Sequence, residues 1–505
     1  MAITIANIPD TIRTPGVHAE IDGSRALKGL YANPHKALIL GNALDSGGAV
    51  VGEKDYWTLV AISQDNMAEG YFGNGSEIAR MCKAFKQNNP NTELYAMAVS
   101  GGTDKASATL QTSVALSANG FSTAGAGTYY LMIDGIDVQV PMTSAWSTTD
   151  VNSIIVDYVN ADSTLPCTAS TNATSAVNLI AVCSGTQGNY LDVRDNYYTW
   201  QSMPAAFSGG DSVQITGFAD GAGTTDLADV WAAIDDERFN YIIQPYIDSA
   251  NLTELEDELE DRFGPLEQKQ GHGFTCVRGT NASCTTLGNS RNSPYNTIIG
   301  MYDSPTSPEE WSAAWGAKGA KYLNQDPARP LHYLELDGIL PPPVESRFTR
   351  AERDVLLYDG ISTFKVSDGG KIQIERCITT YQTNALGISD PTFLDVNTMA
   401  TLGEIRDQWV SRMSTRFLAP RFKLADDGFP VQPGTYVATP SMIKQETIAL
   451  FTLLRDKGYI ENLDDFIENL VVERDVTDRN RVNVLLPPDL INQFRVLAGL
   501  VQFIL

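Results

Sequence analysis

The residues that could do chemistry in this chain are few and widely spaced. The chain has six cysteines and four histidines, at positions 82, 167, 183, 276, 284 and 377 and at positions 18, 35, 272 and 332. Zinc sites need cysteine or histidine ligands at close spacing, and no C-x-x-C pair occurs, so the sequence indicates no metal site. Cys167 and Cys183 could face each other across two strands, but two reduced core thiols are the better prediction for a cytosolic protein.

Nucleotide-binding and hydrolase motifs are also missing. The segments most like a phosphate loop are Gly316–Lys321, which has no Ser or Thr after lysine, and Gly217–Gly223, which has no lysine. We interpret both as turns. No G-x-S-x-G or H-E-x-x-H occurs, and although an acid/base pair among the many carboxylates stays possible, no motif fixes one. Six acidic residues between Glu254 and Asp261 are better explained as a solvated helix face than as a cation site. We expect no catalytic residue, cofactor or metal.

Composition restricts the class of protein. The 505 residues are 43% hydrophobic and 19% charged, as in a folded chain, and their number suggests several domains. A net charge of −25 argues against nucleic acid as a partner, because phosphate binding needs a basic face. No apolar run is long enough to span a membrane, and the first residues do not resemble a signal peptide. We therefore expect a large, acidic, multidomain protein of the cytosol without membrane insertion.

Strand and helix patterns alternate in most of the chain, which predicts an α/β fold. Residues 101–230 differ, since they hold 12 Asp and no Glu against Lys105 and Arg194, and their short strands suggest a β-rich insertion exposed to solvent. The predicted strands are Ala37–Leu40, Glu93–Val99, Tyr129–Ile133, Val138–Val140, Val177–Val182, Tyr241–Gln244, Thr297–Met301, Leu331–Leu334, Val471–Val476, Arg481–Leu486 and Phe494–Leu505. The predicted helices are Ser76–Lys86, Asp150–Val159, Leu227–Asp235, Leu252–Phe263, one starting at Thr349–Asp354, Met399–Phe417, and one from Pro440 to Gly458.

The helix predicted over Met399–Phe417 combines an apolar stripe with a local reversal of charge. Its apolar residues Leu402, Ile405, Trp409, Met413 and Phe417 are spaced for one helix face. Five basic residues in and after the helix outnumber the two acidic ones, Glu404 and Asp407, although the chain as a whole is acidic. These basic residues are Arg406, Arg412, Arg416, Arg421 and Lys423.

Both ends of the chain carry apolar segments that lack an obvious partner. After Pro15, the residues Val17, Ala19 and Ile21 alternate with polar ones, the period of a half-exposed strand. The last residues, from Leu500 to Leu505, are almost entirely apolar. Left free, such segments would favour aggregation, so we expect them to pair with distant strands or with another chain.

Several segments resemble the contractile tail sheath proteins of bacteriophages, in particular the Mu-like sheath family. They occur in family order over nearly the whole chain, and their order makes the resemblance more specific than any one of them. The segments are Ile8-Pro9, Arg13–Val17, Ile21–Ala26, Phe72–Ser76, Asn89-Pro90, Thr92-Glu93, Leu165-Pro166, Thr168–Ser170, Gly185–Asp192, Ile215–Asp226 and Arg479–Gly499.

The resemblance implies a structural protein and a particular domain order. Sheath subunits of this family form stacked six-membered rings around an inner tube, and their terminal arms add strands to neighbouring subunits. For this chain it implies an N-terminal arm (1–25), an α/β segment of the core (26–100), a β-rich outer insertion (101–210), a central α/β domain of subtilisin-like fold (211–345), an α+β C-terminal domain facing the tube (346–488), and a C-terminal arm (489–505). The strand-exchange residues would be Pro15, Val17, Ala19 and Ile21 with Val501, Phe503 and Leu505.

The resemblance also implies the partners and the place of action. The partners would be other copies of the chain, the inner tube protein, and baseplate and terminator proteins at the ends, with neither nucleic acid nor nucleotide. The subunit would be made in the host cytoplasm and act in the virion. Our own inference is that the inner tube is contacted by the basic residues Arg406, Arg412, Arg416, Arg421 and Lys423, because polar contacts can release during contraction. The alternative is that these residues form a solvated face or a contact between subunits. Another tail or baseplate component, or an α/β hydrolase, remains as an alternative identity.

Overall fold

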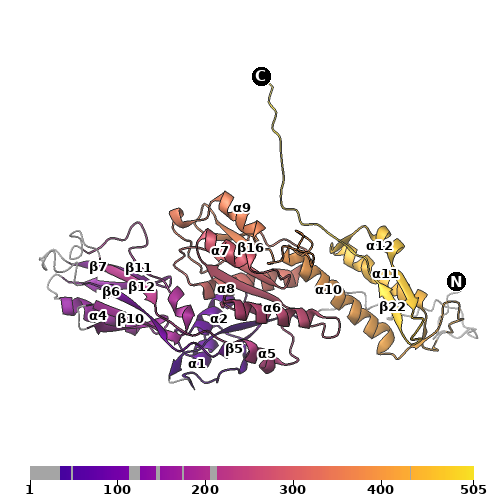
Figure 1. The fold of residues 1–505 in the computed structure, drawn as a ribbon, viewed down its shortest axis with the longest axis horizontal. Helices are drawn as coiled ribbons and strands as arrows, with labels where there is room; N and C mark the ends of the chain where they lie inside the picture. Colours follow the sequence, from indigo (N-terminus) through magenta and orange to yellow (C-terminus); the bar gives the residue numbers. More distant parts are fainter. Residues whose placement is uncertain are drawn as a thin grey trace, which may run out of the picture. The chain divides into compact units, whose positions relative to one another are not determined.

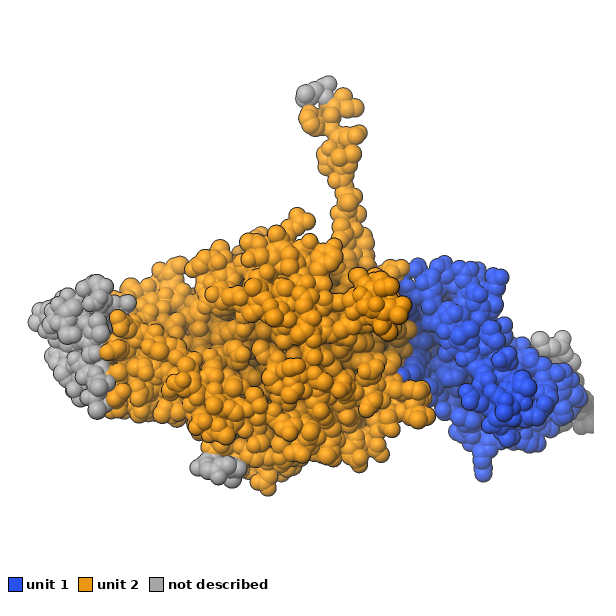
Figure 2. Space-filling view, viewed as in Figure 1, with its two compact units in different colours: residues 1–33, 404–491 blue, residues 34–403, 492–505 orange. Residues whose placement is uncertain are grey.

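The structure is a computed structural model that describes residues 34–46, 49–112, 126–143, 148–172, 176–204, 213–432 and 434–504. The predicted N-terminal strand, with Pro15, Val17, Ala19 and Ile21, lies outside the described residues, as does Leu505. The described chain divides into a large unit of residues 34–403 and 492–504 and a small unit of residues 404–491 (Figure 2).

The large unit is built on an eight-stranded sheet, as the α/β pattern predicts (Figure 1). Its strand order is β17-β16-β15-β14-β13-β1-β5-β4, and the six inner strands run parallel, whereas β17 and β4 are antiparallel to their neighbours. The strands are β1 (Lys36–Asn42), β4 (Leu59–Ile62), β5 (Glu93–Val99), β13 (Tyr241–Ile243), β14 (His272–Arg278), β15 (Asn296–Met301), β16 (Ile361–Val366) and β17 (Ile372–Arg376).

Helices cover both faces of this sheet, so its inner strands are apolar on both sides. On β1, Ala37 and Ile39 contribute to the core cluster that includes residues of α2 (Glu77–Asn88) and α8 (Pro308–Gln325). Leu38 and Leu40 point the opposite way, into a cluster with residues of α5 (Ala228–Ile234) and α6 (Ser249–Phe263). The remaining elements here are α1 (Met67–Phe72), α7 (Asn281–Asn289), α9 (Arg350–Tyr358), the hairpin β2 (Asp45–Ser46) and β3 (Ala49–Val50), and the 3-10 turn Val344–Ser346.

Between β5 and α5 lies a β-rich insertion with its own apolar core, which we call the insertion domain (residues 101–226). It holds two antiparallel sheets, of strand order β12-β6-β10-β9 and β11-β7-β8. Its elements are β6 (Lys105–Gln111), β7 (Gly127–Ile133), β8 (Ile136–Met142), α4 (Thr148–Ala161), β9 (Cys167–Asn172), β10 (Ala176–Ser184), the 3-10 helix Thr186–Tyr190, β11 (Val193–Asp195) and β12 (Gln214–Ala219).

Two expected domain boundaries differ from those in the structure. The insertion was expected to end at residue 210, but β12 pairs with β6 and so continues it to Ala219. The C-terminal domain was expected from residue 346, but β16 pairs in parallel with β15, through Ile361 and Ile298, and extends the central sheet. Both differences arise because the strand partners lie far away in sequence.

The small unit is α+β. Helix α10 (Val396–Met413) enters it at Glu404, and a π-helical turn (Ser414–Leu418) follows. Its core includes the stacked rings of Phe451 and Phe466, whose centroids lie 3.9 Å apart. The other elements are β18 (Lys423–Leu424), β19 (Val437–Ala438), α11 (Pro440–Asp456), β20 (Ile460–Glu461), α12 (Leu463–Asn469), β21 (Val471–Arg474), β22 (Val482–Leu485) and β23 (Asp489–Leu490).

Three local predictions are wrong in whole or in part. Of Gly217–Gly223, also interpreted as a turn, the first three residues belong to β12, which pairs with β6. The segment Gly316–Lys321 is not a turn but part of α8. A Cβ atom at Gly316 would lie 2.5 Å from Ile243, and one at Gly319 would lie 2.5 Å from Phe274, so these small residues let the helix approach the sheet. Residues 331–334 form no strand; only Glu335, just beyond them, makes an isolated bridge, to Gln373.

Candidate assembly surfaces

The C-terminal tail, residues 492–504, is the most exposed apolar segment that the structure describes. It forms neither helix nor strand, so the strand predicted over Phe494–Leu505 is absent from the described residues up to 504, where the segment has no strand to pair with. Figure 1 draws the last part of the tail as an extended trace. Val501 is 90% exposed and Phe503 is 80% exposed, whereas side chains of this kind are normally buried. The exposed large apolar residues of the tail are Phe494, Val496, Leu497, Leu500, Val501, Phe503 and Ile504.

An ion-pair network fixes the base of this tail. The guanidinium of Arg495 lies 2.8 Å from a carboxylate oxygen of Asp395, and that of Arg376 lies 3.3 Å from the same oxygen. These side chains are about one-fifth to one-third exposed. Burial lowers the pKa of Arg495, and the charge of Asp395 opposes this shift. The network ties the tail to the large unit at Arg495 and leaves the residues beyond it uncovered. No sequence signal indicates it, because Asp395 and Arg495 are far apart in the chain.

The strands β21 and β22 form a hairpin that is incomplete as a sheet. They pair only with each other, from Val471 with Leu485 to Arg474 with Val482. Within the described part of the chain, neither has a second strand partner. Two-stranded ribbons have little stability of their own and expose unpaired N–H and C=O groups at both edges. Among the described residues, both outer edges of this hairpin therefore lack a strand partner.

The structure separates the five basic residues proposed to face the tube. Arg412 and Arg416 both donate to Glu446 of α11, at 2.5 and 3.2 Å. Arg406 is half-buried and has interactions within the chain. Arg421 and Lys423 are exposed and make no ion pair among the described residues. Only part of the basic group is therefore free to contact another protein.

The apolar stripe predicted for the same helix faces α11. Ile405 and Met413 are buried, and Trp409 donates its indole N–H to the hydroxyl of Thr447 at 3.3 Å. This contact and the ion pairs of Arg412 and Arg416 with Glu446 hold the end of α10 and the turn after it against α11. The predicted helix is correct in position, although its last residues, from Ser414, form the π-helical turn.

The groups considered for chemistry are placed as structural residues. His272 is buried, which lowers its pKa to about 3, so it is neutral and unsuited to proton transfer near pH 7. All six cysteines are free thiols, and burial raises the pKa of both Cys167 and Cys183 to about 12. On α6, Glu256 is the buried exception to the solvated acidic face, 3.7 Å from Arg291.

Metal and membrane features were searched among the described residues. There, no group of three His, Cys, Asp or Glu side chains is arranged to hold a metal ion. In the same part of the chain, no helix combines the length and apolar character needed to cross a bilayer.

Comparison with known proteins agrees with the resemblance seen in the sequence. Family models for the phage tail sheath central domain and the phage tail sheath C-terminal domain match residues 220–380 and 389–504. The Mu-like prophage tail sheath protein of Haemophilus influenzae is 36% identical over 505 residues, which is the full length of both chains.

Solved sheath structures are similar at a lower level. The sheath tail protein of Desulfitobacterium hafniense is 15% identical, with a TM-score of 0.47 over 94% of this chain and 100% of that chain. The contracted sheath of an extracellular contractile injection system is 9% identical, with a TM-score of 0.48 over 98% of each chain. The full-length relative and the two domain matches decide the assignment: the chain belongs to the Mu-like phage tail sheath family, a family of structural proteins rather than enzymes.

Proposed function

We propose that this chain is the repeating subunit of a contractile tail sheath. Copies assemble as stacked six-membered rings around an inner tube, and contraction drives the tube through the host envelope. Baseplate and terminator proteins cap the ends, and assembly takes place in the host cytoplasm. The central domain has the family's subtilisin-like fold without a protease site, and the lattice itself supplies the energy of contraction. The observation that carries the proposal is the exposed apolar tail beyond Arg495, whose guanidinium ties the base of the tail to its own chain.

The tail and the β21–β22 hairpin each lack a partner that the other could supply. The tail exposes backbone and apolar side chains in an extended segment, and the hairpin exposes unpaired strand edges. Strand addition satisfies both, because it pairs the edge groups and covers the apolar side chains. We infer that the tail of one subunit, with Val501, Phe503 and Leu505, adds to the hairpin of a neighbour, and that the N-terminal arm with Pro15, Val17, Ala19 and Ile21 acts in the same way.

A charge in the tail tests this function. We expect the full chain to form hollow striated tubes in negative-stain electron microscopy. Val501→Asp with Phe503→Asp should abolish them, because both carboxylates would enter an apolar contact. Gln502→Asp is the matched control: it adds a charge at the intervening position, whose side chain lies on the other face of an extended strand, and it should leave tube formation intact. Normal tubes from the double variant would refute strand exchange by the tail.

We further propose that the basic residues of α10 and of the segment after it, up to Lys423, face the inner tube. Arg421 and Lys423 are the strongest candidates because they are exposed and lack ion pairs among the described residues, and Arg416, 54% exposed, is next. Arg406 and Arg412 would act mainly by holding the helix. Reversing Arg421 and Lys423 to Glu should stop sheath from forming on purified tubes while sheath still forms alone. Decoration of tubes at the normal level would contradict this contact.

The insertion domain is proposed to lie on the outer surface of the sheath. It is acidic and rich in small polar residues, so it offers no evident complement to an acidic neighbour. Its own apolar core, which includes Leu110, Tyr129 and Val177, supports removing it as a unit. A chain lacking this domain should still form tubes, and a folded deletion variant that fails to assemble would place the domain inside the lattice instead.

A further inference from the structure

A group of four buried carboxyl groups surrounds a single arginine where the insertion domain meets the central sheet. Glu77 and Arg80 lie on the first turn of α2, and Glu309 and Glu310 lie on the first turn of α8. Asp134 comes from the insertion domain. Except for Glu310, whose side chain is 18% exposed, all are nearly inaccessible to solvent. We call this group the acid joint.

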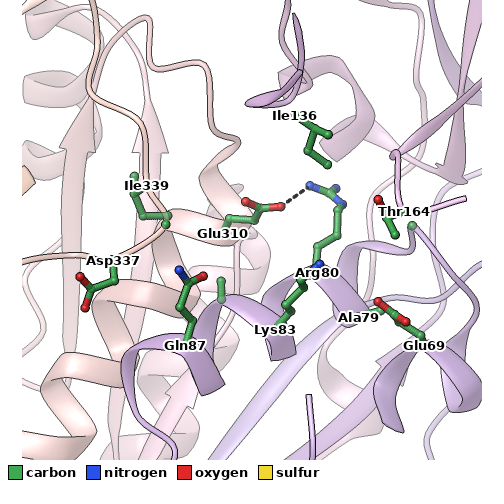
Figure 3. A pocket seen from close by; sticks show the side chains of 13 residues that line it. Glu69, Ala79, Arg80, Lys83, Gln87, Ile136, Thr164, Glu310, Asp337 and Ile339 are labelled. Atoms are coloured by element: carbon green, nitrogen blue, oxygen red, sulfur yellow. Dashed lines mark hydrogen bonds and ion pairs between the residues drawn. The ribbon is translucent and has the colours of Figure 1, made fainter. Parts of the chain in front are cut away.

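Arg80 is the centre of the joint and is shared by three of its carboxyl groups. It donates to Asp134, to Glu309 at 2.7 Å and to Glu310 at 3.2 Å. It also donates to the hydroxyl of Ser307, which precedes α8, at 3.1 Å. Figure 3 shows Arg80 extending from α2 toward Glu310, with Ile136 of the insertion domain close by. The arginine therefore links two helices of the central fold to the insertion domain.

Asp134 reaches the joint because of a tight turn. It connects β7 to β8 with Gly135, and both residues have positive φ angles, of 49° and 79°. The pair Asp-Gly is favoured at the centre of such two-residue hairpins, where both residues must adopt left-handed backbone angles. The turn delivers a carboxylate from the tip of the hairpin into the buried contact.

Glu77 joins the two parts by a second route. Its carboxylate accepts the backbone N–H of Asn42 at 3.3 Å and the hydroxyl of Tyr246 at 3.1 Å. The side chain of Asn42 in turn donates to the carbonyl of Ser184 in the insertion domain at 3.3 Å. From the same strand, Cys183 donates its thiol to the carbonyl of Ala43 at 3.5 Å.

Acceptors exceed donors in the joint. Among the described residues, three acceptors of the joint are buried without a hydrogen-bond partner: one oxygen of Glu309, one of Asp134 and the amide oxygen of Gln187. They stand against a single unpaired donor, the Nε–H of Arg80. Glu77, Glu309 and Gln187 line the same cavity of about 10 Å³, which is near the lower limit for one water molecule. Buried, unpaired acceptors are costly, and a proton on one carboxyl group supplies a donor and removes a negative charge.

The surroundings of Glu77 also affect its pKa. The ionisable groups facing it or its carboxyl neighbours from each packed element are Arg80, Lys83, Glu309, Glu310, Asp134, Arg278, Tyr246, Cys183 and, further out, Lys105. Burial, and then the charge of Glu309, raise the pKa of Glu77 to about 8, although the hydrogen bonds from Asn42 and Tyr246 and the charge of Arg80 oppose this shift. Burial also raises the pKa of Asp134 and of Glu310.

We propose that docking of the insertion domain on the central fold is linked to protons, with Glu77 protonated while the domain is docked. Undocking exposes Glu77 to water, where it releases this proton. Alkaline conditions therefore favour the undocked arrangement, and neutral or acidic conditions hold the domain in place. The fraction of molecules with an undocked insertion domain therefore depends on pH, whereas the central sheet stays folded in both arrangements.

Cys183 gives a local readout of docking. Its thiol lies at the contact itself, so a methanethiosulfonate reagent reaches it when the domain undocks, and mass spectrometry of the peptide that contains it follows the reaction. In the full chain we measure the labelling rate of Cys183 in wild type and in Glu77→Gln at each pH. The rate in wild type divided by the rate in Glu77→Gln is free of the pH dependence of the thiol chemistry, which both chains share. The docked state retains a proton that the open state loses, so this ratio should rise by about tenfold per pH unit between pH 6 and 8.

Controls make the outcome decisive. Glu254→Gln on α6 removes a partly exposed carboxylate far along the chain and should follow wild type at every pH. A ratio that stays constant from pH 6 to 8 would overturn the proposal. A Glu77→Gln chain that fails to fold would overturn it as well, because a neutral side chain of this shape is what the docked state is proposed to contain.

Discussion

The anchor of the tail can be tested by removing one charge. Asp395 is bonded to Arg495, at the base of the tail, and to Arg376 of the central sheet. The substitution Asp395→Asn keeps the shape of the side chain but leaves two guanidinium groups near each other without the carboxylate between them. We expect the base of the tail to detach from the large unit more often.

The size of the effect follows from burial. The side chains of Arg495 and Asp395 are 20% and 22% exposed, between surface ion pairs and fully buried ones. Exposed pairs contribute up to about 1 kcal/mol, and breaking a buried pair costs about 3–5 kcal/mol. We therefore expect Asp395→Asn to lower the free energy of detaching the base of the tail by about 1–2 kcal/mol. This corresponds to about a five- to thirtyfold increase in the detached population.

Trypsin provides the assay because it cleaves after Arg495 only when that side chain is free. Intact-mass spectrometry would follow the loss of residues 496–505, with cleavage after Arg479, 67% exposed, as an internal reference. Asp368→Asn is the matched control, since Asp368 is exposed and remote from the anchor. Equal cleavage after Arg495 in wild type and Asp395→Asn would refute the reasoning that this pair fixes the tail.

Two further predictions concern the fold of the large unit. Gly316→Ala should destabilise the chain by about 1–3 kcal/mol in chemical denaturation, because its new methyl group would meet Ile243. The control Gly70→Ala, in α1, has open space around the new methyl group and should stabilise the chain by about 0.5–1 kcal/mol. Equal effects of the two substitutions would contradict the close approach of α8 to the sheet. Thermal stability should also be highest between about pH 4.5 and 6.5. The buried, neutral His272 has a lowered pKa of about 3, so its contribution to the stability of the protein falls as pH falls below 6.5. The buried Glu77 has a raised pKa of about 8, so its contribution falls as pH rises above 4.5. His272→Gln should flatten the acid side of that profile, and an unchanged profile would show that His272 is not buried neutral.

Local patterns in the sequence predicted elements whose partners are close by. The strand Glu93–Val99 matches β5, and the helix predicted from Ser76 matches α2, with Ser76 as its N-cap. The segment Gly316–Lys321 was misread because glycine favours turns locally, and only the packing of α8 on Ile243 shows why it is needed in a helix. The apolar character of the tail was evident from the sequence, but the strand predicted over Phe494–Leu505 does not form among its described residues.

The acid joint and the tail anchor lay beyond the reach of sequence reasoning for a different reason. Arg80 is 54 residues from Asp134 and 229 from Glu309, and each residue alone has the spacing of an ordinary surface charge. No periodicity distinguishes a charge that will be buried with a partner from one that stays solvated. Such contacts depend on how whole elements pack, which only the folded structure reports.

On the proposed function, the energetics of the tail explain how a lattice can be both strong and able to rearrange. Seven large apolar side chains of the tail would each gain about 2 kcal/mol on burial in a neighbour. Ordering some ten residues of extended chain opposes this by about 1.5 kcal/mol per residue, so the two contributions nearly cancel. A single tail therefore docks weakly, and separate subunits can exchange it. Once ring contacts hold the neighbours at a fixed distance, the effective concentration of each tail at its hairpin becomes high, and many weak additions act together. Assembly by this route is slow until the first ring has formed, whereas loss of one tail leaves the rest of the lattice connected.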